Sequence, residues 1–240
     1  MSSDTSAQWV GRPRATRQRG GGLAPRDEIL DHAAALFAER GYSGTTTRAI
    51  AERVGIRQAS LYYHFAGKDE ILLELLESSV RPSLGFVDAL LTHADPGAAL
   101  YALASIDVGT LLATRHNIGA LYLAHEVQQP QFDSFRAHRA KLQAAYTSLV
   151  GQRDDREFIG ACCMQLVEMV ITLRREGEPG NDTPESIALA CLRVAGAGPV
   201  EIARTSDAGK RLISDLVGIR YQENRGPTDT KSGQSRPSRP

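Results

Sequence analysis

The sequence predicts an all-α protein, and three observations support this fold class. Apolar residues recur at spacings of three and four along most of the chain, as they do on one face of a helix. Strand signals are scarce, and glycine and proline separate the periodic segments. Both ends, 1–24 and 222–240, are polar and lack an apolar period, so we expect a disordered arm and a disordered tail.

The composition restricts the compartment and the chemistry. The 240 residues carry no formal net charge and are 42% hydrophobic, and no segment has the roughly 18 consecutive apolar residues that span a bilayer. The arginine-rich N-terminus lacks the apolar stretch of a signal peptide. Cys162, Cys163 and Cys191 have neither disulfide nor zinc spacing and are predicted to be reduced and buried. We therefore expect a cytoplasmic protein with no membrane partner, metal or cofactor.

The first helix is predicted at 25–40. Pro25 suits a helix start, Asp27 and Glu28 are favourable in a first turn, and Gly41 suits the position after the last helical residue. A single apolar stripe runs along this helix, and it consists of Ile29, Leu30, Ala33, Leu36 and Phe37. Such a stripe has to be covered by the elements that follow.

Two short helices joined by a tight turn are predicted next. Thr45 or Thr46 caps the first, and the second spans about 58–65. Ala51 is small where the two helices approach, and Gly55, four positions later, tolerates positive φ. The apolar residues that hold both helices against the first one are Ile50, Val54, Ile56, Leu61 and Phe65. This pattern over 46–65 is typical of a helix-turn-helix, whose second helix enters the major groove of DNA.

The remainder of the chain is predicted to be a larger helical domain. A fourth helix begins near Lys68 and joins the two halves directly, with Ile71, Leu72, Leu75 and Leu76 as its apolar residues. Further helices are predicted at about 97–113, 117–126, 131–150, 155–175, 184–197 and 207–219. The resulting divisions are an arm (1–24), a three-helix domain (25–70), a helical domain (71–221) and a tail (222–240).

Charge and polarity gather around the helix-turn-helix pattern. The outer side of its second helix carries Gln58, Ser60, Tyr62, Tyr63 and His64, which can reach phosphates and base edges. The neutral net charge conceals a basic arm, because Arg12, Arg14, Arg17, Arg19 and Arg26 face only Asp4 in the first 26 residues. This arm either follows DNA into the adjacent minor groove or serves as a solubilising tail.

The stretch FAERGYSGTTTRAIAERVGIRQASLYYHFAGKDEILLELL resembles the DNA-binding domain of the TetR family of bacterial regulators. The resemblance covers about residues 26–76, and the LYYHF…K signature is its most specific part. It implies that the phosphate backbone is contacted by Thr46, Thr47 and Arg48, and that base edges are faced by Gln58, Ala59 and Ser60. It further implies that phosphates or thymine methyl groups are contacted by Tyr62, Tyr63 and His64, and that Lys68 contacts a phosphate.

Specific contacts with base edges are expected from two adjacent residues, Arg57 and Gln58. Gln58 can pair bidentately with adenine, and Arg57 can instead seek guanine. Several of the residues predicted to contact DNA also have a structural interpretation. One of Tyr62 and Tyr63 is partly buried, His64 is a surface histidine, and Arg48 and Arg57 are solvated residues at helix ends.

The resemblance further implies a homodimer on a palindromic operator, formed by two long helices at about 155–175 and 184–197. The residues assigned to that interface are Phe158, Cys162, Leu166, Met169, Val170, Leu173, Ile187, Cys191 and Val194. The alternative is that this stripe packs within one chain, and the spacing does not separate the two.

The helices at about 84–150 are expected to enclose a small-molecule effector pocket. The residues assigned to it are Phe86, Leu90, Tyr101, Leu111, His116, Leu121, Tyr122, His125 and Phe135. Ordinary core is the alternative for each. The mainly apolar set indicates a hydrophobic effector, and the nine-residue separation of His116 and His125 is no standard metal spacing.

These expectations combine into a transcriptional regulator rather than an enzyme. The chain has no glycine-rich phosphate loop after a strand, no GxSxG elbow and no HExxH motif. The expected function is repression at a palindromic operator, with release by a small, mainly hydrophobic effector. The alternatives are control by a protein partner, the absence of any ligand, and activation in place of repression.

Overall fold

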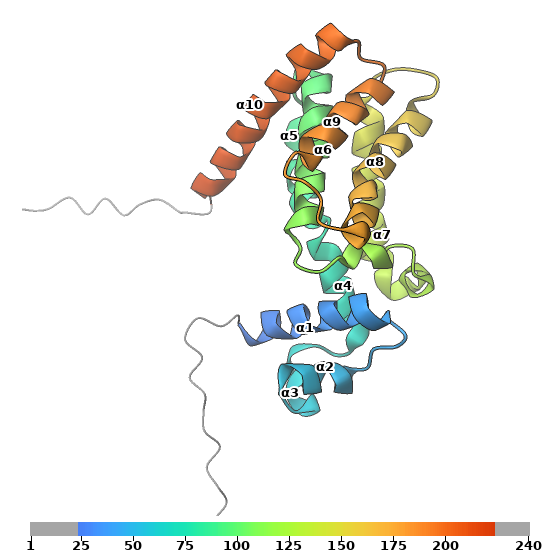
Figure 1. Ribbon diagram of the computed structural model, residues 1–240, viewed down its shortest axis with the longest axis vertical. Helices are drawn as coiled ribbons and strands as arrows, with labels where there is room; N and C mark the ends of the chain where they lie inside the picture. The colour runs from blue at the N-terminus through green and yellow to red at the C-terminus, as the bar shows by residue number, and fades with distance from the viewer. Residues whose placement is uncertain (1–23, 224–240) are drawn as a thin grey trace, which may run out of the picture.

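Helices account for nearly all of the regular structure in the computed structural model, which describes residues 24–223 and contains no strand there. The predicted arm lies outside the described residues except for Ala24, and so does the predicted tail except for 222–223. A small N-terminal group of helices lies at one end of the molecule, and a larger helical body lies beyond it (Figure 1).

The N-terminal group comprises α1 (Pro25–Arg40), α2 (Thr47–Val54) and α3 (Gln58–His64). Their common core is apolar, as predicted, and the residues buried in it are Ile29, Ala33, Leu36, Phe37, Ile50, Ala51, Val54, Leu61 and Phe65. Helix α4 (Lys68–Ser78) packs on α1 and continues towards the body. The predicted domain boundary at 70 therefore falls inside a continuous helix.

The body consists of α5 (Arg81–Leu91), α6 (Pro96–Ala113), α7 (Asp133–Leu149), α8 (Arg156–Glu176), α9 (Thr183–Val194) and α10 (Pro199–Glu223). Helix α6 is its centre and packs against α5, α7, α8, α9 and α10. It is long and apolar enough to cross a membrane by composition alone, but more than half of it is buried among these neighbours, so it serves as a core helix.

Two proline-initiated helices differ from the predicted ranges. Helix α5, with Pro82 in its first turn, is not among the predicted helix ranges, and Pro199 begins α10 eight residues before the predicted start. Proline is favourable in a first helical turn because that position has no intrahelical acceptor for its missing N–H. Helix α10 also extends to Glu223, beyond the predicted start of the tail at 222.

The predicted helix at 117–126 is absent from the described structure. Short 3₁₀ turns replace it: η1 (Ile118–Leu121), η2 (His125–Gln128) and η3 (Pro130–Phe132). Contacts from α8 hold this segment, because the Asn117 side-chain amide donates to the Ile171 carbonyl over 2.7 Å and the Ile171 side chain fills the space beside Gly119. These tertiary contacts outweigh a weak local preference for helix.

Candidate DNA-binding surface and effector cavities

The turn between α2 and α3 has the geometry that the sequence predicted. The Thr46 hydroxyl accepts a hydrogen bond from the Ala49 N–H over 3.1 Å and caps the start of α2. Gly55 ends α2 with a φ of 82°, and its N–H reaches the Ala51 and Glu52 carbonyls. No atom outside its neighbours crowds Gly55, so the backbone angle is what requires glycine there.

Helix α3 is anchored on one side and open on the other. Leu61 and Phe65 are fully buried against α1 and α2, and the Arg26 guanidinium lies 4.3 Å from the centre of the Phe65 ring. On the open side, Tyr63 is 87% exposed and Tyr62 is 50% exposed, so the half-buried tyrosine is Tyr62. Gln58, Ala59 and Ser60 are also exposed, and His64 is partly covered.

A small polar network pre-arranges this open face. The Gln58 side-chain amide donates to the Thr47 hydroxyl over 3.0 Å and lies 3.4 Å from the Tyr62 hydroxyl. Thr47 and Tyr62 are themselves 3.2 Å apart, oxygen to oxygen. Residues from α2 and α3 that were predicted to touch different parts of DNA therefore form one cluster. The predicted base contact of Gln58 would require it to exchange these bonds.

The basic residues near the motif differ in whether they already have a partner within the protein. Arg57 is exposed and has no carboxylate partner among the described residues, whereas Arg48 pairs with Glu52 over 2.8 Å on the surface of α2. Lys68 has partners within the protein. Its ammonium donates to the carbonyls of Tyr42 and Thr45, each over 3.0 Å, and lies over the Tyr42 ring. These contacts hold the loop before α2, and the phosphate contact of Lys68 stays a prediction.

Contacts between the N-terminal group and the body centre on Asp31 of α1. Its carboxylate accepts from Arg115 over 2.9 Å and lies 3.0 Å from the His116 ring nitrogen. Arg174 of α8 in turn bonds the Leu111 and Thr114 carbonyls at the end of α6. His116 was predicted to line the effector pocket, but this ion pair places it at the contact between the two parts of the molecule instead.

Most apolar residues assigned to the pocket belong to the packed core. Phe86, Leu90, Tyr101, Leu111, Tyr122 and Phe135 are all buried, and Leu121 is partly buried. Tyr101 is the clearest case of a core residue, contrary to its assignment to the pocket. Its ring fills the space beside Gly209 of α10, where a side chain would collide with it. His125 is exposed on a turn, and its assignment to the pocket stays a prediction. Of the predicted set, Leu111, Tyr122 and Phe135 line cavities.

A buried polar cluster that the sequence did not reveal lies in the middle of the body. The Asp107 carboxylate of α6 accepts from Ser83 over 2.9 Å and from Tyr146 over 3.0 Å. Burial raises the pKa of Asp107 to about 6, against an ordinary value of 3.8, and the two hydroxyl donors oppose this rise only in part. Nearby, Arg139 of α7 pairs with Glu168 of α8.

A second buried carboxylate ties α4 to the body. Glu77 is almost completely buried, and its oxygens accept from Ser134 of α7 over 2.9 Å and from Arg81 over 3.1 Å, with the His138 ring beside them. Helix α4 is therefore bound to α7 through polar contacts and to α1 through apolar ones. A periodicity search misses Glu77 and Asp107 because both are charged residues at core positions.

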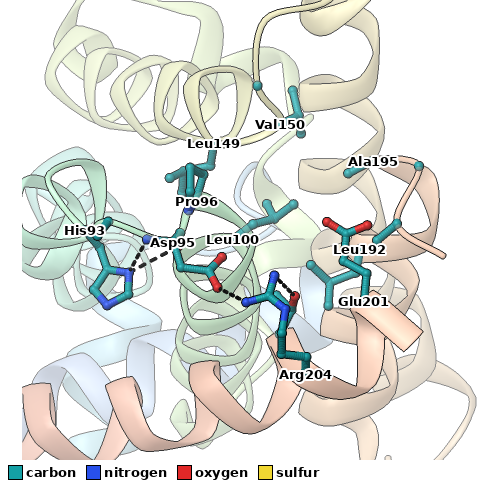
Figure 2. A pocket seen from close by; sticks show the side chains of 16 residues that line it. His93, Asp95, Pro96, Leu100, Leu149, Val150, Leu192, Ala195, Glu201 and Arg204 are labelled. Carbon is teal, nitrogen blue, oxygen red and sulfur yellow. Dashed lines mark hydrogen bonds and ion pairs between the residues drawn. The ribbon is translucent and has the colours of Figure 1, made fainter. Parts of the chain in front are cut away.

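A wide opening lies where α6 and α10 begin and α9 ends, and Figure 2 shows its lining. Its volume is about 730 Å³. Its charged residues largely satisfy one another, because Arg204 pairs with Asp95 over 2.9 Å and Asp95 also caps α6. Another opening, of about 310 Å³, lies between α7, α8 and the turns, and a small cavity of about 10 Å³ lies beside Asp107.

The residues assigned to a dimer interface divide into two groups. Val170, Ile187 and Cys191 are buried within one chain, so their assignment is wrong and the intrachain alternative holds for them. Phe158 is 69% exposed and Met169 is 44% exposed on α8. The remaining assigned residues, Cys162, Leu166, Leu173 and Val194, are partly exposed. An apolar strip therefore remains on the outside of α8 and the end of α9.

The anchored α3, its open polar face and the positive-φ glycine before it define a helix-turn-helix protein with an all-α body. The profile described as "Bacterial regulatory proteins, tetR family" matches residues 29–75. The structure of Mycobacterium smegmatis AmtR is similar over 81% of this chain and 97% of that chain, with 39% identity and a TM-score of 0.73. The chain belongs to the TetR family of bacterial regulatory proteins.

Curated relatives match mainly through the N-terminal part. The negative transcriptional regulator IcaR of the Staphylococcus epidermidis biofilm operon is 40% identical over 78 residues, which are 32% of this chain and 40% of that protein. The transcriptional repressor KstR2 of Mycobacterium tuberculosis is 51% identical over 65 residues, 27% of this chain and 29% of that protein. The matched segment thus spans less than half the length of these relatives.

Proposed function

We propose that the protein is a sequence-specific DNA-binding transcriptional repressor. The observation that carries this proposal is α3, whose buried Leu61 and Phe65 fix it while Gln58, Tyr62 and Tyr63 face outwards. An anchored helix with an open polar face suits insertion into a major groove. IcaR and KstR2, which share this segment, are named as a negative regulator and a repressor.

The proposed active form is a homodimer that binds a palindromic operator. One recognition helix covers too little DNA to select a single site in a genome, and a two-fold dimer doubles the contacts at a set spacing. The exposed strip of Phe158, Met169 and their neighbours on α8 and α9 is the proposed contact surface. Exposed large apolar residues that line up along one face commonly mark such a surface.

The proposed switch is a small effector that binds in the body and changes the spacing of the two recognition helices. Two described contacts provide the connection: Glu77 of α4 with α7, and Asp31 of α1 with the end of α6. An effector acts only through a difference in affinity between the DNA-bound and released arrangements. If α7 or α8 moved when the effector binds, both of these contacts would change.

Operator binding tests the proposal directly. Purified protein is titrated into labelled DNA from the region upstream of its gene, at moderate salt, with unrelated DNA as competitor. We expect a shifted complex that survives the competitor and whose footprint has two-fold symmetry. The proposal fails if binding is equal on specific and unrelated DNA.

Gln58→Ala is expected to weaken binding by about 1–3 kcal/mol and to relax selectivity at one base position in each half-site. The reason is the loss of an amide that can bond a base edge in two places. The measurement is fluorescence anisotropy against operators with single base changes. Gln152→Ala, which removes an exposed glutamine from the loop before α8, is the matched control and should bind as the parent does. Uniform weakening across all operators would contradict a base-reading role for Gln58.

A further inference from the structure

We propose that the opening between α7, α8 and the turn 122–128 is an effector site for an organic anion, a carboxylate carried on a flat apolar body. The inference deepens the proposed function by naming the class of effector. It also replaces the expectation of a purely hydrophobic one. Binding itself can be measured without DNA, so this inference and the repressor proposal can fail separately.

The lining of this opening combines donors with apolar walls. Arg136 and Arg139 present guanidinium groups, each paired with a carboxylate that does not line the opening, Asp133 and Glu168. Gln143 and Gln165 contribute amides, and none of the described residues that line the opening is acidic. Phe135, Tyr122 and Met164 supply flat or adaptable apolar surface. Its volume of about 310 Å³ lies at the lower end of the range for small-molecule sites. A cation would meet guanidinium groups here, whereas a carboxylate would compete with Asp133 and Glu168 for their N–H donors.

Arg139 is the residue best placed to bind the carboxylate. Its guanidinium lies 4.9 Å from the centre of the Tyr122 ring and pairs with Glu168, which keeps it at the inner wall of the opening. Its Nε is a buried donor that has no hydrogen-bond partner among the described residues. A buried donor without a partner costs free energy, so a ligand oxygen that draws the guanidinium away from Glu168 and accepts from Nε would gain affinity.

The small inner cavity bears on the choice between an anion and a cation. Tyr122, Arg139 and Met164 line both spaces, and the two carboxylates, Asp107 and Glu168, line only the inner one. About 10 Å³ leaves room there for a water-sized group only. A ligand in the outer opening therefore meets the guanidinium groups of Arg136 and Arg139 among its lining residues and no carboxylate.

Methionine NMR provides a direct test, because the chain has three methionines, Met1, Met164 and Met169. Met164 lines the opening, whereas Met169 lies outside it, on the strip of α8 proposed for the dimer contact, and provides the reference signal. The full-length protein, labelled at its methionine methyl groups, is titrated with benzoate, benzamide and benzamidine, which share a ring and differ in charge. We expect benzoate to shift the Met164 signal to saturation with little change at Met169, and to bind about tenfold more tightly than the other two probes.

Two variants make the test specific. Glu168 competes with the ligand for Arg139, so Glu168→Gln should tighten benzoate binding about threefold or more, and Arg139→Gln should abolish the preference for benzoate over benzamide. A purely structural role for this ion pair predicts weaker binding of every probe in both variants. Equal affinities for the three probes, tighter binding of benzamidine, or weaker benzoate binding by Glu168→Gln would each overturn the inference. If Arg139→Gln does not fold, the benzoate affinities of the parent protein and of Glu168→Gln still test the inference.

Operator binding without any probe separates the two proposals. Normal operator binding together with no selective benzoate binding overturns only the effector site. Selective benzoate binding by a protein that ignores specific DNA overturns only the repressor.

Discussion

Replacing Phe158 and Met169 together by glutamate is expected to yield a monomer that binds operator DNA at least about a hundredfold more weakly than the parent, because two linked half-sites gain that much over one. Both side chains are largely exposed in one chain, at 69% and 44%. Burying them against a partner would supply apolar contact area, and a carboxylate at either position would be desolvated without a pairing charge. The fold of the single chain should survive, since neither residue belongs to its core.

Light scattering after size-exclusion chromatography measures the oligomeric state, and fluorescence anisotropy with labelled operator DNA measures the affinity. Leu91→Glu is the control, because Leu91 is an exposed apolar residue at the end of α5, away from α8 and α9. It should remain dimeric and bind operator normally. A double variant that still elutes as a dimer would place the interface elsewhere. A monomeric variant with full operator affinity would show that dimerisation is not needed for binding.

Asp107→Asn is expected to stabilise the protein by about 3 kcal/mol at pH 7 and to have little effect at pH 4. Burial raises the pKa of Asp107 to about 6 from an ordinary value of 3.8. Between these two pH values the native protein holds a proton that the unfolded chain has released. The free energy of unfolding of the parent therefore falls as the pH rises from 4 to 6 and stays lower above that. Asparagine carries no charge and avoids this penalty while keeping polar contacts to Ser83 and Tyr146.

Urea unfolding at several pH values between 4 and 8, at one protein concentration, measures the difference between variant and parent. Other carboxylates titrate in both proteins and cancel in this difference. Asp88→Asn, which alters a highly exposed carboxylate on α5, should give a difference that stays near zero. A difference between Asp107→Asn and parent that does not change with pH would show that the pKa of Asp107 is the same in the folded and unfolded protein.

Local sequence determined the DNA-binding part almost completely. Ala51, Gly55 and the apolar residues around them act over a few positions, because the helix caps, the positive-φ turn and the stripe on α1 each depend on near neighbours. The predicted bounds of α1, α2 and α3 agree with the structure to within a residue or so. The family resemblance rested on the same segment, which is also where the curated relatives match.

Tertiary packing decided the rest, because an apolar side chain has the same spacing whether it faces its own core or another molecule. Only the assembled helices show that Val170 and Cys191 are internal while Phe158 and Met169 are not. A charged residue at a core position is likewise invisible to periodicity, so Asp107 and the opening beside Arg139 emerged only from the fold. The sequence by itself determined the helix-turn-helix, and the packing of the body decided where the proposed dimer contact and the proposed effector site lie.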